Sequence, residues 1–503
     1  MIVFSTLRRL WMRVERWGVF AMLSQESYAG IDRRLLVSYF FLALTVFADN
    51  GSFHPLLLIP LTVAFVQAID AVINSRTRSA GGRLFSCLLI LSWGMTFFRP
   101  PGFSENAVSA EAAGFSIPVP MALFLYFALT LAGLLVVLYG LLRKASRRQI
   151  WALLLLFFLA GALVIKGVPY PDIDVHWLQQ AGARSLANGE NPYGIVVPNL
   201  YSVEDTLMFF GDERSVLDAY PYPPVSLLVT IAGWLLAGDV RWAFLAAQLL
   251  CALFIWRMAR KRGHSDRSAL GLVGLWLLHP RGLFVIEMSW TEPLMCATWM
   301  GLILAMTGRP RSKPRAVVVA MGLFLSAKQN SIMVIPWLME RKWNKTILMG
   351  GVLAALACLP FVIWSLHDFL ADVVLFQLRQ PFRPDALGLP ALIAMITGWQ
   401  APTWISLAAW AAGTSWILHR GKIRNESDTI RAWTFTAVTC YFMLFMLAKQ
   451  AFCNYYYFVG LLMIAAAATG NPNEECESRD VMVHPSVLDA RNKLDQLHGK
   501  LTT

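Results

Sequence analysis

The stretch Pro169-Tyr-Pro-Asp172-Ile-Asp174-Val-His-Trp177 opens the longest polar segment in a chain built mostly of apolar runs, and Tyr220-Pro-Tyr-Pro-Pro224 closes it. After Asp174, apolar residues recur at helical spacing with polar residues on the other faces, which predicts an amphipathic helix. Asn188-Gly189 should end that helix, because both residue types tolerate the left-handed conformation. We therefore expect one large structured loop between two sets of membrane-spanning helices.

The composition of the chain is that of a membrane protein. Of its 503 residues, 57% are hydrophobic and 15% are charged, whereas soluble proteins carry about 25% charged residues. Apolar runs such as 117–142 and 150–168 are long enough to cross about 30 Å of hydrocarbon as helices. The sequence predicts an all-α polytopic membrane protein.

Lysine and arginine cluster in alternate connections between the apolar runs. The connections 76–83 and 143–148 are basic, whereas 49–55 and 100–116 contain neither residue type. By the positive-inside rule, the N-terminus is then cytoplasmic and the loop 169–224 is extracytoplasmic. The net charge of +12 follows from this topology, so we predict no nucleic-acid partner.

These boundaries predict four parts of the chain, with both termini in the cytoplasm. They are a basic interfacial segment 1–34, accessory transmembrane helices 35–149, a catalytic core 150–469 with the external loop 169–224, and a polar tail 470–503 with a short helix near 486–498.

Three apolar runs need separate interpretations. Val225–Ala237 is short and precedes a second run and a basic cluster, so we expect it to lie in the outer membrane surface. Leu283–Met306 is interpreted as one arm of a helical hairpin. Ala316–Met339 is expected to be two half-helices broken at Ser326–Asn330, since irregular backbone at membrane depth occurs where it lines a polar cavity.

Charged groups gather on the predicted outer face. A carboxylate there can act as general base for a hydroxyl, and the candidates are Asp172 and Asp174. Cations can hold a phosphate and stabilise its charge, and a charge beside apolar residues costs about 3 kcal/mol, which marks it as functional. The substrate-binding candidates are Lys328, Arg383, Lys449, Arg281, Gln329, Tyr222 and Gln180.

Structural roles for the same residues stay open at this point. Asp172 or Asp174 could cap the following helix. Glu287 and Glu292 could pair with Arg281 as buried ions, and Lys449 could reach the interface from a helix end. The cysteines and histidines have no metal-ligand spacing, so we predict neither a metal site nor a cofactor.

Three motifs in this order resemble the GT-C glycosyltransferases, nearest to bacterial family 87, which uses polyprenyl-phosphate-mannose. An outward span leads to Pro-Asp172-Ile-Asp174-Val-His-Trp, a helix ends at Leu186-Ala-Asn-Gly-Glu-Asn-Pro-Tyr193, and Tyr222-Pro-Pro224 leads to a juxtamembrane helix. The resemblance covers about residues 150–460 and leaves 1–149 outside.

The resemblance implies a GT-C-like helical bundle and an inverting transfer of mannose from a polyprenyl-phosphate donor. The acceptor would be a hydroxyl of a glycan, lipid or protein, at the extracytoplasmic face of a bacterial plasma membrane. Asp174 matches the family's base better than Asp172, because it directly precedes the helix. The alternative is a transporter or flippase of lipid-linked sugars, which often has several broken helices and two related halves.

Overall fold

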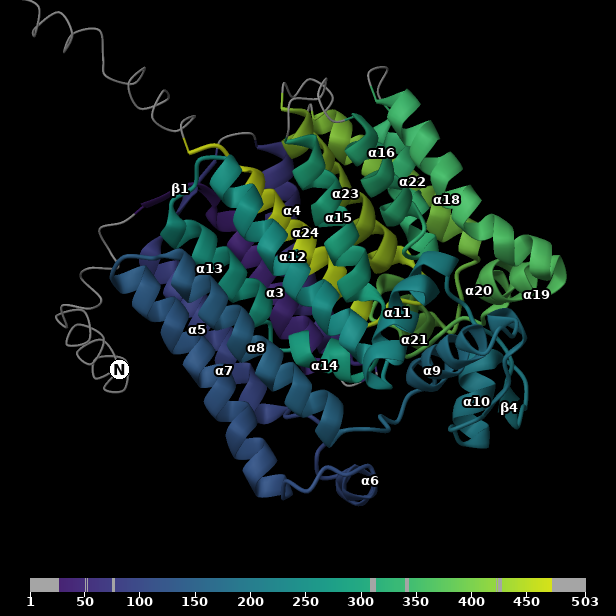
Figure 1. The fold of residues 1–503 in the computed structure, drawn as a ribbon. Helices are drawn as coiled ribbons and strands as arrows, with labels where there is room; N and C mark the ends of the chain where they lie inside the picture. Colours follow the sequence, from purple (N-terminus) through teal and green to yellow (C-terminus); the bar gives the residue numbers. More distant parts are fainter. Residues whose placement is uncertain are drawn as a thin grey trace, which may run out of the picture.

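The protein is a bundle of α-helices, with two short two-stranded ribbons, in the computed structural model (Figure 1). The structure describes residues 27–49, 51, 53–74, 77–307, 314–339, 343–421, 423 and 428–472. Within these residues, six helices are long and apolar enough to cross a membrane: Pro55–Ile73, Val119–Leu142, Arg147–Gly167, Arg241–Lys261, Asn344–Trp364 and Thr429–Leu447. The prediction of an all-α, multi-pass membrane protein is confirmed.

The N-terminal helices pack into the rest of the bundle. They are α3 (Arg33–Ala48), α4 (Leu58–Ile73), α5 (Gly82–Met95), the short α6 (Ala107–Ala112) and α7 (Val119–Leu142). Helix α3 lies against α24 (Cys453–Thr469), and α7 lies against α8 (Arg147–Gly167). One continuous hydrophobic core joins them to the helices that follow.

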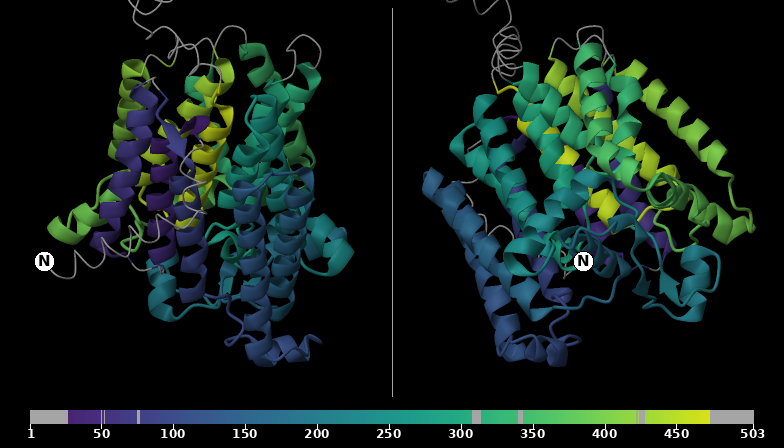
Figure 2. Two further views of the ribbon diagram at one scale, coloured as in Figure 1. Left: turned by 90° about the vertical axis from the view of Figure 1, so that its left-hand side faces the viewer. Right: turned by 45° about the vertical axis from the view of Figure 1, so that its right-hand side comes forward.

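Close helix crossings in the core depend on small residues, as is common in membrane bundles. A Cβ atom on Gly161 of α8 would lie 2.6 Å from Leu245 of α12 (Arg241–Lys261). Arg241 fastens the same pair of helices, because its buried guanidinium donates to the carbonyls of Ile165 and Val168 at 2.9 and 2.6 Å. Figure 2 shows the long helices running side by side.

The polar loop 169–224 folds into short elements at one end of the bundle. They are α9 (Asp174–Ala187), a 3₁₀ turn Pro192–Gly194, β3 (Val197–Pro198), α10 (Val203–Phe210) and β4 (Val216–Leu217). Gly189 follows α9 with φ +74°, which agrees with the predicted helix end. A second hydrophobic cluster, which includes Tyr193, Tyr220 and Phe369, ties this loop to the rest of the molecule.

The remaining helices complete the bundle. They are α11 (Pro224–Ala237), α13 (Asp266–Leu277), α14 (Gly282–Glu287), α15 (Glu292–Met306), α16 (Pro314–Leu325), the 3₁₀ segment η4 (Gln329–Val334), α17 (Ile335–Leu338), α18 (Asn344–Trp364), α19 (Leu366–Leu370), a π-helical turn Ala371–Leu375, α20 (Phe376–Arg379), α21 (Leu389–Thr397), α22 (Thr403–Arg420), α23 (Thr429–Leu447) and α24.

The structure agrees with one of the two interpretations of irregular helices and corrects the other. The predicted break at Ser326–Asn330 lies between α16 and η4. Leu283–Met306 is not one continuous helix, because α14 ends at Glu287 and Ser289 has φ +56° before α15 begins. The position of α11 relative to the membrane stays a prediction. Predictions on 1–26 and 473–503 fall outside the described residues.

Candidate active site

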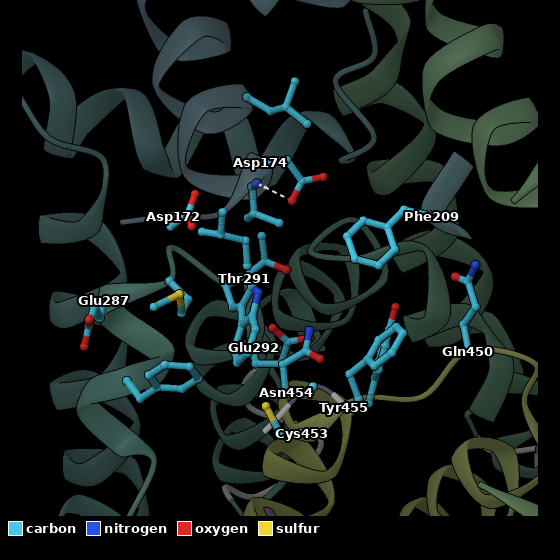
Figure 3. A pocket seen from close by; sticks show the side chains of 18 of the residues that line it. Asp172, Asp174, Phe209, Glu287, Thr291, Glu292, Gln450, Cys453, Asn454 and Tyr455 are labelled. Carbon is cyan, nitrogen blue, oxygen red and sulfur yellow. Dashed lines mark hydrogen bonds between the residues drawn. The ribbon is translucent and has the colours of Figure 1, made fainter. Parts of the chain in front are cut away.

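A cavity of about 820 Å³ lies where the polar loop meets the bundle, and the break between α16 and η4 and the N-terminal connections also line it. Figure 3 looks into it. Seven of the nine candidate residues named from the sequence line this one cavity: Asp172, Asp174, Tyr222, Arg281, Lys328, Gln329 and Arg383. Most of the candidates, far apart in the sequence, are thus brought together.

Asp174 is the first residue of α9. One of its carboxylate oxygens accepts hydrogen bonds, and the other accepts none from the described residues. Its Oδ1 accepts hydrogen bonds from the Val175 backbone N–H at 2.8 Å and from the Tyr201 hydroxyl at 2.9 Å. No described residue donates to Oδ2. Burial raises the pKa of Asp174, and the bond from Tyr201 and the charge of Arg383 offset part of that rise. A carboxylate with a raised pKa is a better general base.

Neither aspartate caps α9. The residue before the helix is Ile173, which provides no side-chain cap, and Asp172 is exposed on the cavity wall. Asp174 bonds the N–H of the next residue, whereas a capping side chain bonds an N–H two or three residues on. The capping interpretation of both aspartates is therefore wrong.

A buried ion pair forms another part of the cavity wall. Lys328, at the break after α16, pairs through Nζ with Oε1 of Glu292 at the start of α15. Asn454 Nδ2 donates to the same oxygen at 3.0 Å, and Nζ lies 4.7 Å from the centroid of the Tyr455 ring. Helix N-termini favour negative charge, which helps to explain why Glu292 can be buried here.

The guanidinium group of Arg383 lies against two aromatic rings. Its guanidinium carbon lies 3.9 Å from the Phe209 ring centroid and 4.8 Å from that of Phe452. Asp385 accepts from Nε and Nη2 at 2.7 and 2.5 Å. Because this bidentate pair holds Nε and Nη2, the guanidinium is fixed in orientation, and its remaining N–H groups point in a defined direction.

Gln329 ties the helix break to the polar loop. Its Nε2 donates to the carbonyl of Pro221 at 2.5 Å and to that of Val373 at 3.3 Å. The polar loop and the π-helical turn Ala371–Leu375 are thereby anchored to one residue in the bundle.

Two candidates do not line the cavity. Lys449 donates through Nζ to the carbonyl of Gln380 at 2.6 Å, and its neighbour Gln450 lines the cavity instead. Gln180 is partly buried on α9, where its Oε1 has no hydrogen-bond partner among the described residues. Both stay predictions without a contact to the cavity.

Arg281 forms an ion pair with neither Glu287 nor Glu292, although the sequence left that pairing open. Arg281 donates to the backbone carbonyls of Phe47 and Asp49, at 3.4 and 3.0 Å, at the end of α3. Glu287 Oε1 accepts from the backbone N–H of Gly102 at 2.9 Å. Both side chains therefore join the core to N-terminal connections, and that interpretation of buried ion pairs is wrong.

Sequence reasoning left Tyr201 and the N-terminal connections out of the site, and it considered Glu292 mainly as a buried partner of Arg281. Tyr201 was one aromatic residue among many in the loop. Glu292 had a signal, because an acid at the start of an apolar helix is unusual. Arg99 to Glu105 carried no such signal, because their neighbours in the cavity come from distant parts of the chain.

Comparison with known proteins gave one informative similarity. No family model and no solved structure matches the chain. A segment of 146 residues is 28% identical to GPI mannosyltransferase 1 of the fungus Gibberella zeae, and it covers 28% of this chain and 28% of the fungal protein. The chain is thus similar to a mannosyltransferase over little more than a quarter of that protein's length.

Proposed function

We propose that this protein is a membrane glycosyltransferase that transfers a sugar, mannose by preference, from a polyprenyl-phosphate donor to an acceptor hydroxyl. The carrying observation is the free Oδ2 of Asp174 in the same cavity as the cations Lys328 and Arg383. A base and phosphate-binding cations are the groups that such a transfer needs. The similarity to a mannosyltransferase supports the same reaction class.

In the proposed step, Asp174 Oδ2 takes the proton of the acceptor hydroxyl. The acceptor oxygen attacks the anomeric carbon, and the bond from that carbon to the phosphate oxygen breaks. The polyprenyl phosphate leaves with the electron pair, and the configuration of the sugar is inverted. Lys328 and Arg383 hold the phosphate and stabilise the negative charge that grows on it.

The finer identity that we propose is a GT-C enzyme of the family 87 type, in the plasma membrane. The basic connections predict cytoplasmic termini and an extracytoplasmic cavity. Nucleotide-activated sugars are cytoplasmic, so a lipid-linked donor suits this orientation. The acceptor is a hydroxyl of a glycan, lipid or protein.

A transporter or flippase of lipid-linked sugars is the second candidate function. Two interrupted segments, α14–α15 and α16–η4, meet at the Glu292–Lys328 pair, and transporters build their binding sites from such segments. This function needs no proton acceptor, so it predicts no special effect of Asp174.

The test is sugar transfer in membranes with polyprenyl-phosphate-mannose as donor, comparing wild type with Asp174→Asn. The substitution keeps the size and removes the base, so we expect transfer to fall about 100-fold or more. Glu213→Gln, on an exposed site of the same loop, is the control and should transfer normally. Unchanged transfer by Asp174→Asn at normal expression would show that Asp174 is not the base. The transporter would be favoured if the wild-type protein transfers no sugar but moves the lipid-linked sugar across the membrane of vesicles.

A further inference from the structure

The connection between α5 and α7 brings two carboxylates together in the cavity wall. A Cβ atom on Gly102 would lie 3.1 Å from both Glu105 Oε2 and Glu287 Oε1, so the two groups meet beside this glycine. In Figure 3, Glu287 lies on the same side of the pocket as Asp172, and Phe209 and Gln450 lie on the other side. This group, here called the Gly102 wall, includes Gly102, Glu105 and Glu287.

Glu287 has an unused oxygen in a buried position. Its side chain is 3% exposed, and among the described residues nothing bonds its Oε2, although Oε1 accepts from the Gly102 N–H. A buried polar atom without a partner is destabilising, because it has lost its hydrogen bonds to water. A hydrogen-bond donor on a ligand would remove that cost.

The chemistry around the Gly102 wall suits hydroxyl groups. Glu105 is exposed, and Arg99 and Arg281 line the same cavity while donating to carbonyls at the end of α3. Acids accept hydrogen bonds and guanidinium groups donate them, and a hydroxyl does both. The carboxylates disfavour an anion, and the two arginines disfavour a cation.

We propose that the Gly102 wall is the acceptor subsite and that it binds a neutral saccharide. This inference rests on the proposed glycosyltransfer and names its acceptor class. The donor phosphate binds at Lys328 and Arg383. Arg383 contacts Phe209, which lies on the opposite side of the pocket from Glu287. The N-terminal helices then supply acceptor recognition to a core that holds the donor.

Saccharide binding to the full-length protein in nanodiscs tests this subsite. The probes are a methyl mannobioside and methyl glucuronide, and saturation-transfer NMR measures their binding. We expect saturable binding of the mannobioside, with the anionic glucuronide at least tenfold weaker. Glu287→Gln and Gly102→Ala should each weaken the mannobioside at least tenfold, since the first removes an acceptor charge and the second fills the space between the carboxylates.

Matched variants keep the result interpretable. Glu105→Gln changes an exposed side chain and preserves the fold, and it should weaken binding several-fold. Glu111→Gln, an exposed site on α6 outside the cavity, should bind normally. Farnesyl phosphate, a donor-like probe, should bind every variant equally. The subsite is overturned by absent mannobioside binding, or by binding that Glu105→Gln and Glu287→Gln leave unchanged. If transfer fails but these variants still lose mannobioside binding, the transfer reaction is wrong and the saccharide site stands.

Discussion

At the scale of single residues, Tyr201 influences the protonation state of Asp174. Its hydroxyl donates to Oδ1, which stabilises the charged carboxylate and opposes the rise in the pKa of Asp174 that burial causes. A base is active only when it is deprotonated, so transfer should fall as the pH drops through that pKa.

Tyr201→Phe removes the hydroxyl and should therefore raise the pKa of Asp174 further. We expect the acid limb of the kcat/KM profile to move to higher pH, while transfer at alkaline pH stays close to that of wild type. Tyr170→Phe is the matched control, because Tyr170 is exposed and stacks on Trp177. An unchanged acid limb in Tyr201→Phe would show that another group titrates.

The choice between Asp172 and Asp174 shows what a sequence can predict about this site. Both acids could be recognised from their position after a membrane span. The distinction depends on Tyr201, which lies 27 residues beyond Asp174. That contact exists because the polar loop turns back on itself, and no local pattern predicts the path of such a loop.

At the scale of elements, the Glu292–Lys328 pair joins the start of α15 to the break after α16. Both side chains are buried, so either charge alone would lack compensation. Glu292→Gln should lower stability by about 3–5 kcal/mol, because it leaves the Lys328 ammonium buried without its partner. Glu292→Gln with Lys328→Met should recover much of that loss, since no charge remains. Thermal unfolding in detergent measures both.

The same pair of variants separates structure from chemistry. If Lys328 holds the donor phosphate, the double variant should be folded and still defective in transfer. A double variant that is as stable as wild type and transfers at the wild-type rate would limit Lys328 to a structural role.

Element boundaries were predictable where the sequence carries a local signal. Lysine, glutamine and asparagine inside an apolar run predict the break at Ser326–Asn330. The break before α15 also had a local signal, because Glu292 and Pro293 are typical of a helix start, but the apolar residues around it favoured one continuous run. The Ser289 hydroxyl lies 2.7 Å from His176 Nδ1 of the polar loop, and this long-range contact is a feature of the tertiary fold.

At the scale of the whole molecule, the N-terminal helices are the part that sequence reasoning left without a role. Apolar runs predict that a segment crosses the membrane, but they do not predict its neighbours. Helix α3 lies against α24, from the other end of the chain, and its C-terminal carbonyls hold Arg281. The connection that follows α5 reaches the cavity, so these helices contribute to the site as well as to the core.

The orientation of the bundle in the membrane is a prediction from where its charges lie. Helix α8, about 30 Å long, separates the basic connection at 143–148 from the polar loop. Ser215→Cys in that loop and Lys144→Cys at the opposite end are both at exposed positions. In intact cells a membrane-impermeant maleimide should label the first, and it should label the second only after permeabilisation. The unsubstituted chain measures the background of the natural cysteines. The reverse pattern would turn the cavity toward the cytoplasm, where a nucleotide-activated donor is accessible, and would remove the argument for a lipid-linked sugar.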